Sequence, residues 1–127
     1  MKNLKTIAFI AALTILLSCK KDKEDKPTAP SRTLRYEVSG NFTGTFIVSY
    51  TTASGGTAND QVTLPWTKEI TYADNITAAI VLLTGNGGIG GQKVLLVTKR
   101  GGAQIATFEA VAEASGSFSK PAPVIVF

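Results

Sequence analysis

The sequence predicts an all-β fold, a single antiparallel β-sandwich of about seven strands over residues 33–127. Apolar residues alternate with polar ones from Leu34 onward, which is the period of a strand with one buried face. Turn-forming segments separate these runs at intervals of roughly 8–12 residues. The chain shows no convincing helical pattern in this range, so sheet packing is expected to build the whole core.

The expected strands and turns follow in chain order. The faces predicted to be buried carry Leu34, Tyr36 and Val38; Phe46, Val48 and Tyr50; Ile70 and Tyr72; and Ala106, Phe108, Ala110 and Ala112. The expected turns are Gly40-Asn41, Ser54-Gly55-Gly56, Gly85 to Gly91 and Gly101-Gly102.

Two further segments are apolar on both faces, and a third fits either a helix or a strand. The runs 76–83 and 94–97 are apolar on both faces, which predicts central strands covered on both sides. The run QIATFEAVAEA (104–114) fits a helix or a strand, because its alanines and glutamates favour helix. The preceding Arg100-Gly101-Gly102 turn and the final PVIVF favour a strand.

Residues 1–18 resemble a secretory signal peptide. Lys2 and Lys5 form a basic start, an apolar run from Ile7 to Leu17 is broken only by Thr14, and the small Ser18 precedes the expected cleavage point. The run is shorter than the roughly 20 apolar residues that cross a bilayer. A short N-terminal membrane anchor or a buried helix is the alternative.

The only cysteine predicts a lipid anchor. Leu16-Leu17-Ser18-Cys19 resembles a bacterial lipobox, in which the cysteine thiolate forms a thioether to diacylglycerol. Acyl chains such as palmitate then hold the protein by about 0.8 kcal/mol for each buried methylene. A free thiol is the alternative. The expected location is the cell envelope, at the outer membrane, facing either the periplasm or the exterior.

Residues 19–32 form the expected tether, which is charged, rich in proline and predicted to be disordered. Lys23-Glu24-Asp25 resembles the signal that exports Bacteroidetes lipoproteins to the cell surface. The net charge of +4 arises outside the domain, since acidic and basic side chains balance from Thr33 onward. A nucleic-acid partner is therefore not expected.

The sequence offers few combinations of residues that could catalyse a reaction or bind a metal. The chain has no histidine, and Cys19 is assigned to lipid, which excludes Ser-His-Asp and Cys-His sets and ordinary zinc sites. Asp60 and Asp74 are expected in turns, and Glu37, Glu69 and Glu109 on outward strand positions. The chain is predicted not to be an enzyme and to bind no metal or cofactor.

Two features remain as candidate ligand or partner surfaces. Gly85-Asn86-Gly87-Gly88-Ile89-Gly90 matches the dinucleotide fingerprint, but a strand rather than a helix is expected after it, so a hairpin loop is predicted. Gly87 and Gly88 lie in this loop. Trp66 is predicted to be a buried plug between the sheets, with an exposed ligand platform as the alternative.

Four segments resemble the mycobacterial small membrane proteins of the MmpS type. They are YEVSG (36–40), IVSYTT (47–52), VTLPWTKEI (62–70) and GQKVLLVTKRGGAQIA (91–106). The resemblance covers nearly all of residues 34–114, with Leu64-Pro65-Trp66 as its most specific part. It implies an immunoglobulin-like sandwich outside the cytoplasmic membrane that accompanies a resistance–nodulation–division transporter. This chain differs in its expected lipid anchor and lacks the family's frequent cysteine pair.

The expected function is that of a membrane-anchored, non-catalytic binding or accessory module of the cell envelope. Its partners are the membrane, through the lipid, and an envelope protein such as a transporter. The alternative is a structural subunit of a pilus-like surface assembly, in which the C-terminal PAPVIVF (121–127) is donated to a neighbouring subunit.

Overall fold

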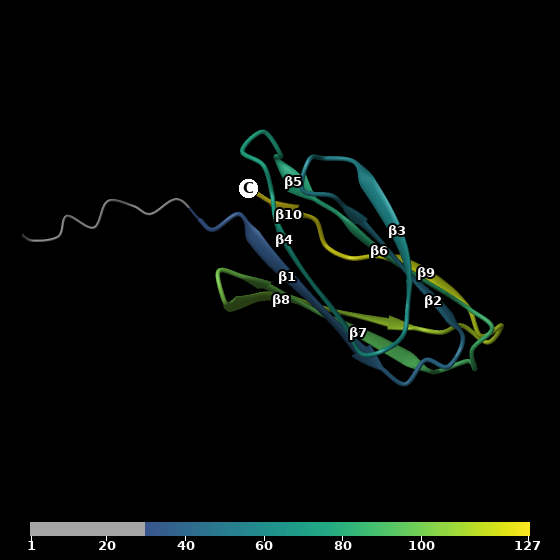
Figure 1. Cartoon of the computed structure of the whole chain (residues 1–127). Helices are drawn as coiled ribbons and strands as arrows, with labels where there is room; N and C mark the ends of the chain where they lie inside the picture. The colour runs from purple at the N-terminus through teal and green to yellow at the C-terminus, as the bar shows by residue number, and fades with distance from the viewer. Residues whose placement is uncertain (1–29) are drawn as a thin grey trace, which may run out of the picture.

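A computed structural model describes residues 30–127. This part of the chain contains strands and no helix, which confirms the all-β prediction (Figure 1). The strands are β1 (Thr33–Gly40), β2 (Thr45–Thr51), β3 (Thr57–Val62), β4 (Trp66–Thr71), β5 (Ala78–Ala79), β6 (Val81–Asn86), β7 (Lys93–Arg100), β8 (Ala103–Val111), β9 (Phe118–Pro121) and β10 (Ile125–Val126). The count exceeds the predicted seven because β3 and β9 were not expected and because the single strand expected over 76–83 is divided into β5 and β6.

The strands form two four-stranded antiparallel sheets and a short ribbon. One sheet has the order β4-β1-β7-β8, the other β3-β2-β6-β9, and β10 pairs with β5. The links β1–β2, β3–β4, β6–β7 and β8–β9 all cross from one sheet to the other. The sheets therefore face each other with β4 and β3 at one side and β8 and β9 at the opposite side (Figure 1).

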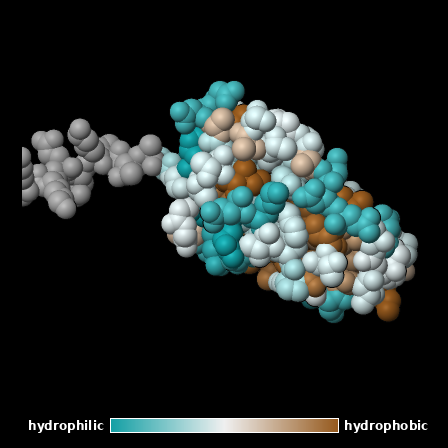
Figure 2. All heavy atoms as spheres, viewed as in Figure 1, coloured by the Kyte–Doolittle hydropathy of each residue, from teal (hydrophilic) through white to brown (hydrophobic). Residues whose placement is uncertain are grey.

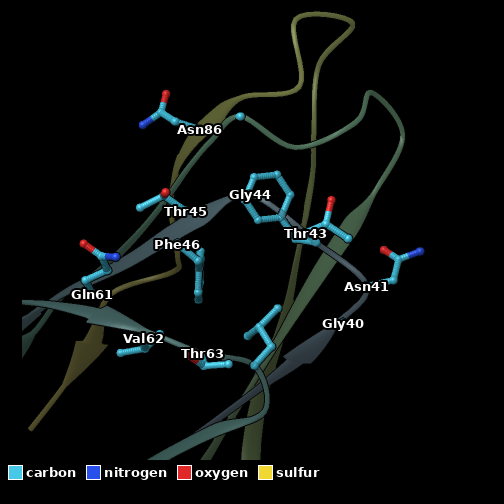
Figure 3. Close-up of a pocket in the computed structure, with 13 residues that line it drawn as sticks. Gly40, Asn41, Thr43, Gly44, Thr45, Phe46, Gln61, Val62, Thr63 and Asn86 are labelled. Carbon is cyan, nitrogen blue, oxygen red and sulfur yellow. The ribbon is translucent and has the colours of Figure 1, made fainter.

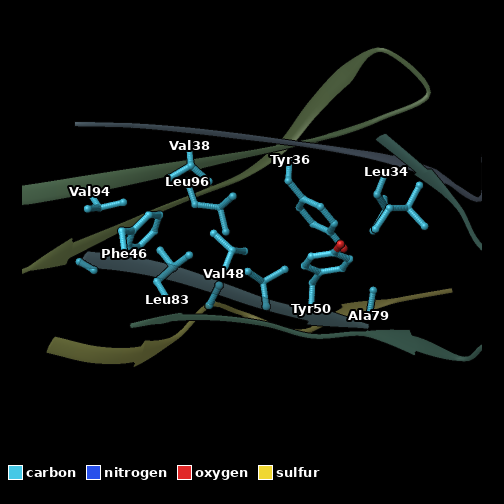
Figure 4. Close-up of a cluster of buried hydrophobic side chains, with 14 of the residues drawn as sticks. Leu34, Tyr36, Val38, Phe46, Val48, Tyr50, Ala79, Leu83, Val94 and Leu96 are labelled. Atoms are coloured by element: carbon cyan, nitrogen blue, oxygen red, sulfur yellow. The ribbon is translucent and has the colours of Figure 1, made fainter. Parts of the chain in front are cut away.

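The core consists of the inward faces of the two sheets. Leu34, Tyr36 and Val38 project from β1, and Phe46, Val48 and Tyr50 project from β2, as the alternation predicted (Figure 4). Val94 and Leu96 of β7 and Leu83 of β6 lie at 0–1% exposure and complete its centre. Burial of this apolar surface is the main stabilising contribution to the fold.

The prediction that two runs are covered on both sides was wrong. Leu95 of β7 faces outward and is 37% exposed, and Ile80 is 51% exposed between β5 and β6. Both β6 and β7 are central strands, but the molecule has only two layers, so nothing among the described residues covers their outer faces. The run QIATFEAVAEA supplies β8, which confirms the strand prediction.

The loop at residues 85–91 is not the expected hairpin. It connects β6 to β7 in different sheets, because β6 pairs with β2 and β9 whereas β7 pairs with β1 and β8. A strand follows it, as expected, so the helix that a dinucleotide fingerprint requires is not there. The Gly101-Gly102 turn does form the predicted hairpin, between β7 and β8.

One end of the sandwich carries the start of the described chain and Phe127 (Figure 1). The guanidinium groups of Arg32 and Arg100 lie over the Phe127 ring, 4.5 and 4.9 Å from its centroid, and the ring packs on Tyr72. Arg100 also donates a hydrogen bond to the Ser31 carbonyl at 2.7 Å. Residues 31–32 are thereby attached to the domain at what we call the junction end.

The C-terminal strand pairs within its own chain. Ile125 and Val126 of β10 lie opposite Ala79 and Ala78 of β5, and the Phe127 N–H donates to the Thr77 carbonyl at 3.0 Å. Donation of this strand to another subunit would first require these contacts to break. No helix within residues 30–127 is long and apolar enough to span a membrane.

Candidate functional site

The end opposite the junction holds a recess with a volume of about 690 Å³. The β1–β2 loop, the end of β3 with the residues after it, and the end of β6 form its walls, and we call it the distal recess (Figure 3). Its polar lining is Asn41, Thr43, Thr45, Gln61, Thr63 and Asn86. These are amides and hydroxyls without formal charge, so the recess suits a neutral, hydrogen-bonding ligand or peptide segment.

Two side chains fix the loops around the distal recess. The Gln92 side-chain carbonyl accepts hydrogen bonds from the Thr43 N–H, the Thr43 hydroxyl and the Ile89 N–H, at 3.0–3.1 Å. The Asn41 side-chain oxygen accepts one from the Lys93 N–H at 2.7 Å. Each contact joins segments that are far apart in sequence or closes a loop. The rim of the recess is therefore pre-organised, which lowers the entropy lost on binding.

Three phenylalanines support the recess from below. Phe42 packs edge-on against Phe118 with ring centroids 5.0 Å apart, and Phe46 lies 6.0 Å from Phe118. Phe42 and Phe46 line the floor of the recess, but all three rings are at least 93% buried, so little of their surface is open to a ligand. The cluster acts as a rigid base under polar walls rather than as a stacking platform.

A second feature lies at the side of the sandwich where β3 and β4 form the sheet edges. Trp66, half-buried on β4, has its ring 6.0 Å from the Tyr50 ring of β2 in the other sheet. The contact between sheets was predicted, but the complete burial expected of a plug was not found. An edge strand has no neighbour on its outer side, and this leaves one flank of the indole open.

Tyr50 is also the centre of a small polar cluster. Its hydroxyl donates to the Asp60 carboxylate at 2.7 Å, and the Lys68 ammonium lies 5.4 Å from the ring centroid. Burial and the Asp60 hydrogen bond raise the pKa of Tyr50 above its usual value. The hydroxyl is therefore protonated at neutral pH and acts as a donor rather than as a base.

Asp60 is not in the turn that the sequence suggested. It lies within β3, on the half-buried face that points toward β4. Its neighbours Asn59 and Gln61 made the segment resemble a turn, although residues 57–62 alternate between exposed and half-buried positions. The predictions for Glu37, Glu69 and Glu109 on outward strand positions and for Asp74 in a turn are confirmed.

The described residues contain no group of three metal-ligating side chains. Likewise, no buried side-chain nitrogen or oxygen within residues 30–127 lacks a hydrogen-bond partner. Each buried polar side-chain atom in this range therefore has a hydrogen-bond partner.

The predicted site residues fall in different places. Gly87 lines the distal recess, Gly88 packs beneath the loop against Phe42, and Trp66 lies outside the recess on β4. Cys19 and the lipobox residues Leu16, Leu17 and Ser18 lie outside the described residues. The structure thus brings Gly87 and Gly88 together without Trp66.

Sequence reasoning missed the residues that shape the recess. Gln61, Thr63 and Asn86 come from separate segments that only the folded sheets bring together. Asn41, directly after a turn glycine, and Asn86, in the glycine-rich loop, had a visible signal, because asparagine side chains often form hydrogen bonds with the backbone next to turns. Neither a protein-family model nor any curated protein matches this chain significantly.

Proposed function

We propose that this protein is a lipid-anchored, non-catalytic binding module of the cell envelope that engages its partner through the distal recess. The observation that carries the proposal is that the attachment point and the recess lie at opposite ends of the domain. Residues 31–32 join the domain at one end, and the recess opens at the other. A domain held by a lipid at Cys19 would present the recess away from its point of attachment.

The chemistry of the recess favours recognition over catalysis. Its polar groups are uncharged, and its loops are already fixed by Gln92 and Asn41. A flexible peptide segment or a glycan of an envelope partner offers the donors and acceptors that such walls can satisfy. The resemblance to small membrane proteins suggests a transporter as the partner, and that identification belongs to the same proposal.

Anchoring is tested by replacing Cys19 with alanine in the full chain. The expected result is loss of the protein from the membrane fraction after an alkaline wash, with the thermal unfolding of the domain unchanged. A Cys19→Ala protein that still pellets with membranes would contradict lipid anchoring. Binding at the recess does not require the lipid, so that result would not bear on it.

Partner binding is tested by photo-crosslinking in living cells. Probes at Asn86 and Gln61, on the rim of the recess, should capture the same defined envelope protein, identified by mass and then bound again in purified form. The matched control is Thr67, an exposed residue of β4 outside the recess. Equal capture from all three positions, or none from the rim, would refute a binding role for the recess.

A further inference from the structure

The short ribbon of β5 and β10 exposes an apolar face. Ala79 and Ile125 lie opposite each other in this ribbon and face the core. Side chains alternate along a strand, so the neighbours of these two residues face outward. We call the outward residues the β10 patch: Ala78, Ile80, Val124 and Val126. The three branched side chains of the patch are 51–68% exposed, and hydrophobic atoms reach the surface close to β10 (Figure 2).

The segments that build the β10 patch carry no charged side chain. Residues 75–86 and 121–127 contain neither acids nor bases, and the second segment adds the exposed Pro121 and Pro123. Asp74, just before the first segment, lies 3.9 Å from the guanidinium of Arg32, which offsets its charge. A grouped apolar surface of this kind is typical of a site that contacts a protein or a membrane.

The patch lies at the point where the chain enters the domain. The Arg100 guanidinium donates one hydrogen bond to the Ser31 carbonyl at 2.7 Å and another to the Val126 carbonyl at 3.2 Å. The Arg32 guanidinium donates to the carbonyls of Ala73 and Ile76, in the segment that leads into β5. Residues 31–32 are therefore bonded to both segments of the ribbon, beside the most exposed residue of the patch.

The chain before Ser31 identifies what this surface meets. Cys19, the proposed site of the lipid, precedes Ser31 by 12 residues, and a chain of that length spans at most about 40 Å. The anchor therefore keeps the junction end within that distance of the bilayer. A short tether also gives the patch a high effective concentration at the membrane, so a weak affinity for lipid is enough to hold it there.

We propose that the β10 patch rests on the lipid bilayer to which the chain is anchored, with Val124 and Val126 in the headgroup region. This inference depends on the anchoring proposed above. Apolar side chains gain free energy when they are buried at the boundary between headgroups and acyl chains, and the segments of the patch bring no carboxylate to that boundary. Contact at the patch gives the domain a fixed orientation, in which the distal recess points away from the membrane.

The first test places a tryptophan reporter on the patch of the full lipidated chain, purified from membranes. Trp66→Phe removes the native tryptophan, and Val126→Trp supplies a new one. The protein is incorporated into phosphatidylcholine vesicles with or without bromine on the acyl chains, because bromine quenches tryptophan on contact. The Val126→Trp emission should shift to shorter wavelength, and bromine should lower it by about half. Ile89→Trp, at an exposed apolar position of the opposite end, is the matched control and should not respond.

Flotation of the same vesicles separates this proposal from the anchoring on which it depends. A chain that floats with the vesicles but shows no quenching of Val126→Trp would overturn this proposal alone. So would a shift to shorter wavelength without quenching, because a second copy would then cover the patch. Equal quenching of Val126→Trp and Ile89→Trp would show that the domain has no fixed orientation and would also overturn it. A chain that does not float would contradict both proposals.

The second test changes the patch itself in the chain that carries the Val126→Trp reporter. Val124→Asp puts a carboxylate at the boundary between headgroups and acyl chains, and should lower the quenching by about fivefold. Ser119→Asp is the matched control, because it adds the same charge at an exposed position of β9, opposite Thr84 and outside the patch. Thermal unfolding confirms that both variants are folded. Quenching that persists in Val124→Asp would show that the tether alone holds the domain at the bilayer, and would refute the proposal.

Discussion

The hydroxyl groups of Tyr36 and Tyr72 lie 2.9 Å apart inside the sandwich, and they form the first step of a hydrogen-bond relay between the sheets. The Tyr72 hydroxyl donates to the Thr51 carbonyl at 2.8 Å. Its single hydrogen is thereby used, so the Tyr36 hydroxyl donates to Tyr72. The relay ties β1 to the end of β2 through the residue that follows β4.

Removing the two hydroxyls should have unequal effects. Tyr72→Phe leaves both the Tyr36 hydroxyl and the Thr51 carbonyl without a partner, and should lower the free energy of unfolding by about 2 kcal/mol. Tyr36→Phe removes one donor while Tyr72 keeps its bond to Thr51, and should cost about 1 kcal/mol. Urea unfolding of both variants measures the difference. Equal losses would mean that the relay does not run in this direction.

Stability should fall at alkaline pH. Burial, chiefly, raises the pKa of Tyr36 and of Tyr72 above the ordinary value of 10.0, and the hydrogen bond that Tyr36 donates to Tyr72 adds to the rise at Tyr36. The folded state therefore binds these protons more tightly than the unfolded state. Their contribution is complete below about pH 10 and is lost as pH rises through the folded pKa.

The measurement is the unfolding midpoint as a function of pH. It should decline from about pH 10 upward in the wild type and less steeply in Tyr36→Phe. Glu37→Gln is the control, because hydrogen bonds from Lys99 and then Arg35 lower the pKa of Glu37. This change should alter the pH dependence only on the acid side and leave the slope of the alkaline decline as in the wild type. An alkaline limb that is identical in Tyr36→Phe would show that Tyr36 is not responsible.

Replacing Trp66 should cost less than the loss of a fully buried aromatic residue. Full burial would predict about 3–5 kcal/mol for Trp66→Ala, but the half-buried ring at an edge strand predicts about 2 kcal/mol. Trp66→Phe should retain most of the contact with Tyr50. Chemical unfolding checks both values, and an unchanged stability in Trp66→Ala would reopen the ligand-platform interpretation.

Gly87 and Gly88 form a matched pair for testing the support of the recess. A Cβ on Gly88 would meet the Phe42 ring at 2.2 Å, whereas a Cβ on Gly87 has nothing within 4 Å. Gly87→Ala should therefore cost only the positive φ of 73°, about 1 kcal/mol. Gly88→Ala should cost more, because it displaces the phenylalanine base. Thermal unfolding of the two variants shows which loses more stability, and a larger loss in Gly87→Ala would contradict the close packing of Gly88 against Phe42.

The sequence predicted the inward faces well because strand alternation has a period of two and the strands follow it closely. Leu34, Tyr36 and Val38 were assigned correctly for this reason. The exposure of the outer faces was harder to predict, since Leu95 and Ile80 are apolar yet exposed. Composition alone does not distinguish an uncovered apolar side chain from a buried one.

The candidate site was less predictable, for a topological reason. The distal recess depends on crossings between sheets, and local pattern does not reveal whether a glycine-rich loop closes a hairpin or passes to the other sheet. The loop from Gly85 to Gly91 passes to the other sheet. Gln92 likewise has no local signal, because its partner Thr43 lies 49 residues away.

The position of Trp66 also determines what the intrinsic fluorescence of the protein reports. It is the only tryptophan in the chain, and its indole lies 6.0 Å from the Tyr50 ring across the two sheets. Light absorbed by Tyr50 is therefore transferred efficiently to a single emitter. The intrinsic emission of the protein reports on the separation of the sheets at the β3–β4 side, without an added dye and without disturbing either the distal recess or the β10 patch.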